Sequence, residues 1–205
     1  GVVSTTGGYV AGISGLNDGT ISGCGNTGDI SSVDYGNPAG ICGTAAEEDA
    51  YVVGCWNSGT VSLGGTELGD AGGICSYVRS GATLAYCYNY GPVEYGGGIV
   101  GMESSANIAS CLYDSAFVAS SNSYGTASTT EEIQSQDYID DYNDYVDTSP
   151  LEGLAYWVSD ESDTNGGYPV LAPEDVLCRV EIQVSGRGAV TPCRPFGILP
   201  GRSRT

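Results

Sequence analysis

The sequence predicts an all-β fold, a parallel β-solenoid of about four rungs, and three observations carry this prediction. A motif of the form apolar-x-x-Cys-x-Asn-x-Gly-x-apolar recurs along the first part of the chain. A second motif, built on Gly-Ile, alternates with it in a fixed order. The 205 residues include 33 Gly and only 8 Pro, with no Gly-X-Y period, which favours tight turns and excludes collagen. Such units stack because one unit cannot bury its own apolar face, and we expect a right-handed stack.

The first motif predicts the inner side of each rung. It spans Ile21–Ile30, Val52–Val61 and Leu84–Val93, with a degenerate copy at Ile108–Phe117. Its cysteines are expected to face inward as small hydrophobic side chains, and its asparagines to lie at a corner and bond to neighbouring rungs. These ladder residues are Cys24, Cys55, Cys87, Cys111, Asn26, Asn57 and Asn89. The following Gly is expected to be left-handed, and the closing residue (Ile30, Val61, Val93 or Phe117) to point into the core.

The second motif predicts a short strand that ends in a tight turn. It occurs at residues 11–15, 39–43, 72–76 and 97–101, the last copy reading Gly97-Gly-Ile-Val-Gly101. Glycine tolerates the backbone conformations of a tight turn, and a β-branched residue favours a strand. From the Ile of each copy to the next motif Cys there are 11 to 14 residues. We therefore assign the constant motifs to stacked strands and the variable spacers to loops on the outer rim.

These two motifs resemble a known family. Gly97-Gly-Ile-Val-Gly101 and Cys87-Tyr-Asn-Tyr-Gly91, in alternation over about residues 8–118, are similar to the GLUG repeat. Such repeats occur in large bacterial surface proteins, including adhesin-like proteins and the non-catalytic parts of IgA-specific metallopeptidases. The resemblance implies a β-solenoid, a location outside the cell or on the surface of a bacterium, and no defined catalytic activity.

Residues 119–172 are expected to form a C-terminal cap on the solenoid of residues 1–118. A polar loop leads to Thr129-Thr130-Glu131-Glu132, which predicts a helix start with a capping threonine. One apolar face (Ile133, Ile139, Tyr142, Val146) continues to Ser149-Pro150, where the helix should end. A short aromatic strand follows at Trp157 and at 165–171, similar to the segment that often follows GLUG repeats. We expect this cap to cover the last rung and to block edge-to-edge pairing.

Residues 173–205 are expected to be a linker and the truncated start of a following β domain. Val180–Val184 alternates like a strand, and the sequence VEIQVSGRGAVTP resembles the first hairpin of small β domains found in tandem on bacterial surface proteins. Residues 185–205 are expected to be poorly ordered. Cys178 and Cys193 are expected either to form a disulfide or to stay free. Because the chain starts within the repeat pattern, we interpret it as a piece of a longer protein.

The charge excludes one class of partner. The formal net charge is -19, Lys and His are absent, and Arg79 is the one basic residue before position 179. Such a surface repels phosphate, so we predict no nucleic-acid partner. No apolar run is long enough to span a membrane, so we predict no membrane insertion. Two acidic groups, at 137–147 and 160–165, contain ligand types for Ca²⁺ but lack the glycine and closing Glu of an EF-hand loop; we predict no metal site and no cofactor.

The sequence carries no recognisable catalytic motif. Without His, neither a nucleophilic triad of the usual kind nor an HExxH zinc centre can form, and a polysaccharide lyase would lack its usual base. Motif cysteines about 30 residues apart, with no CxxC, do not fit a zinc site, so a buried ladder of free thiols that includes Cys42 and Cys75 is favoured. A hydrolase needs only two carboxylates, so it stays an alternative. The carboxylates in the spacers are Asp34, Glu47, Glu48, Asp49, Glu67 and Asp70.

Aromatic residues are the feature that favours recognition of a partner. Several of the 15 Tyr flank an inward Cys or lie in spacers, so some must face outward, where they can stack on sugar rings or contact a host protein. The candidates are Tyr35, Tyr51, Trp56, Tyr77, Tyr88, Tyr90 and Tyr95. The alternative is an outer ladder that only stiffens the solenoid. We expect a non-catalytic structural or adhesive module of a bacterial extracellular protein, with a carbohydrate-active or carbohydrate-binding β-helix as the alternative.

Overall fold

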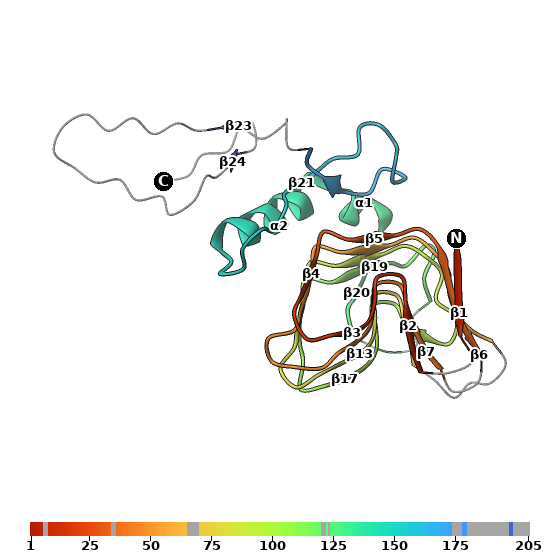
Figure 1. Cartoon of the computed structure of the whole chain (residues 1–205). Coiled ribbons are helices and arrows are strands. Elements are labelled where there is room, and N and C mark those ends of the chain that lie inside the picture. Colours follow the sequence, from red (N-terminus) through yellow and green to blue (C-terminus); the bar gives the residue numbers. More distant parts are fainter. Residues whose placement is uncertain are drawn as a thin grey trace, which may run out of the picture.

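The computed structural model confirms the parallel β-solenoid of about four rungs. It describes residues 1–5, 8–33, 36–64, 70–119, 122 and 124–173, together with the backbone of 178–179 and 197–198. The described strands of the stack form five parallel sheets, here called A to E in the order in which each rung visits them. Figure 1 looks along the stack, and the rungs overlay one another in projection. The predicted right-handed sense of the stack stays a prediction.

The strands repeat in the same order in every rung. Sheet A contains β1 (Val2–Thr5), β6 (Asp29–Val33) and β11 (Val61–Gly64). Sheet B contains β2 (Gly8–Ala11), β7 (Gly36–Ala39), β12 (Ala71–Gly72) and β16 (Gly96–Gly97). Sheet C contains β3 (Ser14–Asn17), β8 (Cys42–Ala45), β13 (Cys75–Arg79) and β17 (Val100–Ser104). Rungs 1 to 3 therefore start at β1, β6 and β11, and rung 4 starts at Val93, which forms an isolated parallel bridge with Val61 before β16.

Sheets D and E complete each rung. Sheet D contains β4 (Thr20–Ser22), β9 (Tyr51–Val53), β14 (Thr83–Ala85) and β18 (Asn107–Ala109). Sheet E contains β5 (Gly25–Asn26), β10 (Trp56–Asn57), β15 (Tyr88–Asn89), β19 (Leu112–Asp114) and β20 (Thr126–Ser128). Strand β20 lies beyond residue 118 but pairs in parallel with β19, so the stacked strands continue to Ser128.

Each rung is pinched into two lobes, and the second motif forms the pinch. In Figure 1 the outline is indented between β2 and β3, and here the motif turns from sheet B to sheet C. A Cβ atom built on Gly40 would lie 2.2 Å from the carbonyl oxygen of Gly73 and 2.5 Å from Cγ of Asn57. Only glycine allows this approach. The Gly-Gly-Ile segment is thus a turn between two strands instead of the end of one.

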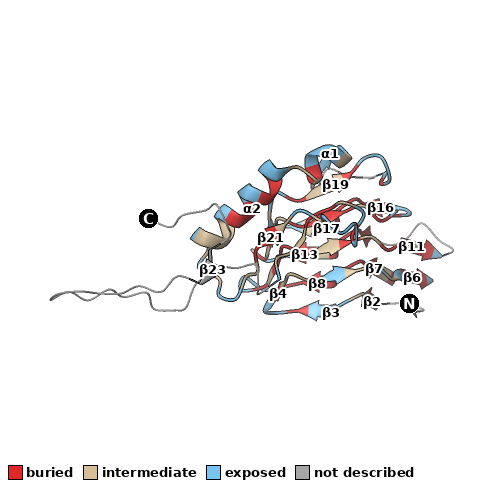
Figure 2. Cartoon of the chain, turned by 90° about the horizontal axis from the view of Figure 1, so that it is seen from above, coloured by how far each residue is buried: buried red, intermediate tan, exposed pale blue. Residues whose placement is uncertain are grey.

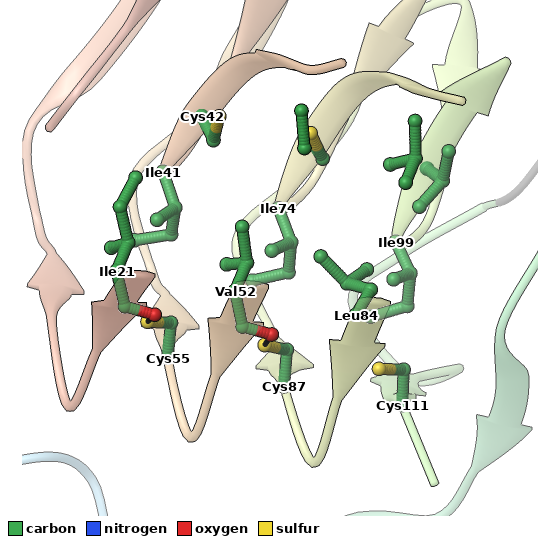
Figure 3. Close-up of a cluster of buried hydrophobic side chains, with 14 of the residues drawn as sticks. Ile21, Ile41, Cys42, Val52, Cys55, Ile74, Leu84, Cys87, Ile99 and Cys111 are labelled. Atoms are coloured by element: carbon green, nitrogen blue, oxygen red, sulfur yellow. Dashed lines mark hydrogen bonds between the residues drawn. The ribbon is translucent and has the colours of Figure 1, made fainter. Parts of the chain in front are cut away.

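The larger lobe holds the main core. Its apolar columns run along the stack, as Figure 3 shows for Ile41, Ile74 and Ile99, all of which are fully buried. The cysteines form parallel columns, with Cys55 and Cys87 fully buried as predicted and Cys24, in the first rung, partly exposed. The smaller lobe is filled by a second cluster, which consists of Val61, Leu63, Ala71, Val93 and Val118.

The asparagine ladder is confirmed. Nδ2 of Asn26 donates to Oδ1 of Asn57 at 2.7 Å, and Nδ2 of Asn57 donates to Oδ1 of Asn89 at 2.8 Å. Each amide also donates to the carbonyl of the glycine two residues later, as Asn57 does to Gly59 at 2.8 Å. Because Asn57 and Asn89 are fully buried, these bonds satisfy groups that have no access to water.

Two predictions about the first motif were wrong. The left-handed residue is not the glycine after Asn but the residue before Cys: Gly23, Gly54, Tyr86 and Ser110 have φ of 58°, 61°, 50° and 51°. Glycine at position 59 is required for another reason, because a Cβ there would lie 2.0 Å from the carbonyl oxygen of Gly28. Phe117 does not point into the core but is exposed, and Val118 is buried in its place.

The C-terminal segment contains the predicted helical and strand regions, but it has two helices where one was predicted and a pair of strands where one was predicted. The predicted single helix is two: α1 (Thr130–Ile133) has the Thr129–Glu132 capping box, and α2 (Gln136–Thr148) starts afresh at the N-cap Ser135. The strands β21 (Trp157–Val158) and β22 (Val170–Leu171) are antiparallel.

Most of this segment covers the side of the solenoid instead of its end. Val53 and Ala85 of sheet D lie in one cluster with Tyr138, Ile139 and Tyr142 of α2, and Figure 2 shows α2 slanting beside the stacked rungs. A further short pair, β23 (Cys178–Arg179) with β24 (Gly197–Ile198), is antiparallel. The expectations for Val180–Val184, the thiols of Cys178 and Cys193, and the order of 185–205 concern parts that lie outside the described residues.

Candidate functional site: the aromatic flank and the segment that covers it

Aromatic side chains gather on the outer side of sheet E. Along β10, Cys55 and Asn57 point inward, so Trp56 between them points outward, as the alternation of a strand requires. Trp56 pairs in register with Tyr88 of the next rung, and their rings are stacked at 6.2 Å with an interplanar angle of 10°. The rings of Tyr88 and Tyr90 are also stacked, with centres 6.4 Å apart. We call Trp56, Tyr86, Tyr88 and Tyr90 the aromatic flank.

The aromatic residues predicted to contact a partner differ in how far they are buried. Tyr88 is fully buried, so the prediction that it presents an outward contact surface was wrong. Tyr51, Trp56 and Tyr90 are partly buried against the same cluster, and Tyr77 is partly buried with the guanidinium of Arg79 5.6 Å from its ring centre. Among the described candidates, Tyr95 alone is exposed, at 62%. Tyr35 lies outside the described residues.

The chain's own C-terminal segment covers the aromatic flank. The ring of Tyr168 lies parallel to that of Tyr90, with centres 3.9 Å apart and planes 6° apart. The hydroxyl of Tyr88 donates to the carbonyl of Pro169. Asn165 joins the two flank residues, because its Nδ2 donates to the Tyr88 hydroxyl at 2.8 Å and its Oδ1 accepts from Tyr90 at 2.7 Å. Burial raises the pKa values of Tyr88 and Tyr90, so both hydroxyls stay protonated donors at neutral pH.

A loop centred on Asp160 positions Asn165. The carboxylate of Asp160 accepts hydrogen bonds from the backbone amides of Thr164, Asn165 and Gly167, at 3.0, 2.6 and 3.2 Å. Burial alone would raise the pKa of Asp160, but these bonds outweigh it and hold that pKa below its ordinary value. In the acidic loop of residues 160–165, which the sequence offered as a weak Ca²⁺ candidate, the carboxylate of Asp160 therefore stabilises the loop conformation.

A buried carboxylate fixes the same segment to the last rung. Asp114, in β19, is fully buried and accepts hydrogen bonds from the hydroxyl of Thr130 at 2.6 Å, from the hydroxyl of Tyr168, and from the amide of Ala116 at 2.8 Å. Burial and the bond to Asp114 raise the pKa of Tyr168. Three donors compensate the cost of burying this charge.

Sequence reasoning missed the polar residues that hold the flank together, namely Asp114, Asn143 and Asn165. Asn143 is fully buried on α2 and pairs with the backbone of Trp157, with its Nδ2 donating at 3.0 Å and its Oδ1 accepting at 2.8 Å. A signal existed for Asn143, because it lies four residues after Ile139 and is therefore a polar residue within the apolar face of the helix. A polar side chain in such a place needs a hydrogen-bond partner. No comparable signal marked Asp114, which lies at a motif position that Thr27, Ser58 and Tyr90 fill in the other copies.

One depression lies on this C-terminal segment, outside the rungs. It has a volume of about 670 Å³, between α2 and the strand pair, and its lining includes Asp140, Trp157, Asp160, Glu161, Val170 and Leu171. Trp157 is fully buried, and its indole nitrogen has no hydrogen-bond partner. Asp140 accepts from Gln136 at 3.1 Å, and Asp160 holds its loop, so two of the three carboxylates already have structural partners.

The other acidic residues named in the sequence analysis do not gather into one site. Glu47, Glu48 and Asp49 are exposed in the β8–β9 loop, and Asp70 is partly buried beside sheet B. Asp34 and Glu67 lie outside the described residues. On α2, Asp137, Asp140, Asp141 and Asp144 are exposed. Where the structure describes side chains, no three or more His, Cys, Asp or Glu residues are grouped to hold a metal ion.

The thiols are buried hydrogen-bond donors. Sγ of Cys87 donates to the carbonyls of Val52 at 3.4 Å and Ala85 at 3.5 Å, and Figure 3 shows the contact between Cys87 and Val52. Burial raises the pKa values of Cys75 and Cys87. Because the thiolate is the reactive form, these cysteines are poor nucleophiles at neutral pH.

Comparisons with known proteins do not add a family. No protein-family model matches the chain, and searches of curated proteins and of solved structures also returned no match. Among the described helices, none has the length and apolar character needed to cross a lipid bilayer.

Proposed function

We propose that the chain is a non-catalytic structural or adhesive module of a bacterial extracellular or cell-surface protein. The observation that carries this proposal is that the side chains with the chemistry of a site are used within the fold. The asparagines bond to one another, the described cysteines lie in the core, and the aromatic flank is covered by the segment around Tyr168. The location outside the cell rests on the resemblance of the two motifs to GLUG repeats.

Two exposed aromatic side chains are available for an adhesive contact at turns of the chain. Tyr95 follows Val93 at the start of rung 4, and Phe117 follows Asp114 near the end of the same rung; both rings are exposed beside the smaller lobe. Exposed aromatic side chains can contact a host protein or stack on a sugar. The anionic surface around them disfavours acidic partners and keeps the module soluble.

The second candidate is a carbohydrate-binding or carbohydrate-active β-helix, and the depression beside α2 favours it. Carboxylates and amides around a partly apolar floor are groups that bind sugar hydroxyls and rings. Catalysis would need two carboxylates roughly 5–10 Å apart with freedom to act as acid and base. Asp160 is held by three amides of its loop, whereas Asp140 accepts one bond from the side chain of Gln136, so Asp140 and Glu161 are the pair to test.

A glycan array combined with hydrolysis assays on plant and mucin polysaccharides separates the two proposals. The structural or adhesive module should give no turnover, and any retained glycan or host protein should be lost in Tyr95→Ala but kept in Tyr77→Phe. Turnover that falls at least about 100-fold in Asp140→Asn or Glu161→Gln would replace our proposal with the carbohydrate-active one.

A further inference from the structure

The motif cysteines of rungs 3 and 4 lie opposite each other. Tyr88 of β15 pairs in register with Leu112 of β19, and the amide of Leu112 donates to the carbonyl of Cys87 at 2.9 Å. The residues before this pair are Cys87 and Cys111, so they are opposite as well, and Figure 3 shows them in one row with Cys55. Stacked strands lie roughly 4.8 Å apart. This spacing falls within the range of about 4.4–6.8 Å between Cα atoms that a disulfide spans.

The two thiols are in contact but not bonded. Both cysteines are free, and both side chains belong to the main core cluster. Burial raises the pKa of Cys87, and its hydrogen bonds to the thiols of Cys111 and Cys55 raise that pKa further. Cys87 therefore has a thiol neighbour on either side, in rung 2 and in rung 4. Access from solvent decides which neighbour it can be joined to.

Access exists on the side of Cys111. A depression of about 340 Å³ lies between the strands of rung 4 and the chain at 124–126, and its lining includes Glu103, Ser110 and Cys111. Cys111 is 2% exposed, whereas Cys55 and Cys87 have no exposed surface. A small reagent in this depression therefore meets Cys111 first, with the thiol of Cys87 behind it.

We propose that Cys87 and Cys111 are an oxidisable pair, in which a small organic disulfide entering this depression converts the two stacked thiols into a disulfide bond between rungs 3 and 4. The thiolate of Cys111 attacks one sulfur of the reagent, which forms a mixed disulfide and releases one reagent thiol. The thiolate of Cys87 then attacks the sulfur of Cys111 and releases the second. The two cysteines lose two protons to solvent and two electrons to the reagent, which leaves as two thiols.

The order of the two attacks follows from burial. The raised pKa of Cys87 makes it a poor nucleophile towards a reagent in solution. Its attack on Cys111 is intramolecular and starts from contact, and such proximity compensates for a small fraction of thiolate. The bond would tie rung 4 to rung 3 and restrict the unfolded chain. Outside a cell, where disulfides persist, the bonded form would be the resident one.

The test exposes the folded chain to cystamine, a small disulfide with two positive charges that suits the net charge of -19. The chain carries Cys24→Ala, which removes a partly exposed thiol from rung 1. After free thiols are alkylated in acid, cleavage after Arg and Glu places Cys87 in residues 80–94 and Cys111 in residues 104–131. We expect mass spectrometry to find these two peptides linked, and a reducing agent to separate them.

The pair Cys42 and Cys75 is the internal control. These two cysteines are also opposite each other in register, and both are fully buried. The bond between Cys87 and Cys111 should exceed theirs at least about tenfold, because a reagent reaches it without unfolding of the chain. Equal formation of the two bonds would overturn the proposal, since oxidation would then pass through the unfolded chain. A bond from Cys87 to Cys55 would also overturn it.

A second variant separates the two steps. Cys87→Ala removes the second nucleophile, so the mixed disulfide should remain on Cys111 and residues 104–131 should carry half of cystamine. Circular dichroism checks that this variant is folded under the conditions of the reaction. A folded Cys87→Ala chain in which Cys111 stays unmodified would show that the depression does not admit the reagent, and the proposal would fail.

Discussion

The stack of rungs and the segment along its flank keep their shape by different kinds of contact. In the stack, like residues meet, as Asn26, Asn57 and Asn89 do along their ladder. On the flank, residues that have no equivalent in other rungs make the contacts, as Asn165 does with Tyr88 and Tyr90. Each stack contact repeats in the next rung, whereas each flank contact occurs once.

Because of this difference, a substitution in the stack should disturb more of the structure than a substitution on the flank. An inner residue of the stack touches equivalents above and below it, so one poor fit disturbs three rungs. A flank residue fastens one segment to a surface that is already formed, so its loss should free that segment and leave the rungs folded. The predictions below test this distinction.

The largest effect is expected for Cys87→Asp. Cys87 is fully buried between the equivalent positions of rungs 2 and 4, and an unpaired carboxylate there costs several kcal/mol. We expect the cooperative unfolding transition followed by circular dichroism to disappear, whereas Cys87→Ala should keep it with a lower midpoint. An Asp variant that melts like the parent would show that the register of the stack is wrong.

Tyr168→Ala should have a large but local effect. The substitution removes the ring stacked on Tyr90 and the hydroxyl bonded to Asp114, which is then left buried with one donor fewer. Loss of a buried aromatic side chain costs about 3 kcal/mol. We expect limited proteolysis to cut between residues 150 and 173 while the rungs keep their far-ultraviolet circular dichroism.

Tyr95→Ala is the matched control, because that side chain is exposed and its loss should change stability by less than about 0.5 kcal/mol. If Tyr168→Ala instead unfolded the rungs together with the flank, the two regions would form one cooperative unit and the distinction drawn above would fail.

Gly59→Ala should lower the stability of the stack by about 2 kcal/mol. The added methyl group would lie 2.0 Å from the carbonyl oxygen of Gly28, so adjacent rungs must move apart. Gly19→Ala is the control, because no atom lies within 4 Å of the position of its Cβ. Urea unfolding of the two variants should therefore differ clearly, and equal midpoints would contradict the close approach of the rungs.

The stack could be predicted from the sequence because repetition carries the information. Recurrence of Cys and Asn at one spacing implies that equivalents stack, whatever the loops do, and the structure places Cys55 and Asn57 accordingly. The left-handed position could not be found this way, because Gly54 is replaced there by Tyr86 and Ser110, residues that do not mark such a conformation.

The flank resisted prediction because its contacts join residues far apart that occur once. The capping threonine of α1 was recognisable from Thr129 and Glu132, yet nothing local shows that α2 lies beside sheet D. The bond between Tyr90 and Asn165 spans 75 positions. For the same reason outward aromatic residues were interpreted as a surface for partners, whereas the chain itself covers most of them.

The smallest effect on stability is expected for Asp160→Asn. The size of this effect should depend on pH, and the lowered pKa of Asp160 predicts in which direction. The folded state holds the pKa of Asp160 below its ordinary value of about 3.9. The stability contributed by this carboxylate is therefore present above about pH 4 and is lost as the pH falls through the folded-state pKa. An amide has one acceptor oxygen where the carboxylate has two, so the variant loses part of the loop at neutral pH.

Urea unfolding followed by tryptophan fluorescence reports on the flank, because both Trp56 and Trp157 belong to or pack against its cluster. The difference in unfolding free energy between parent and variant should be largest at pH 6, and it should shrink as the pH falls below about 4 and through the folded-state pKa, because the parent carboxyl then becomes protonated too. A difference that stays constant over this range would mean that Asp160 acts through its shape and not its charge. In that case the loop would hold Asn165 against Tyr90 by packing alone, and the flank would depend on pH no more than the stack does.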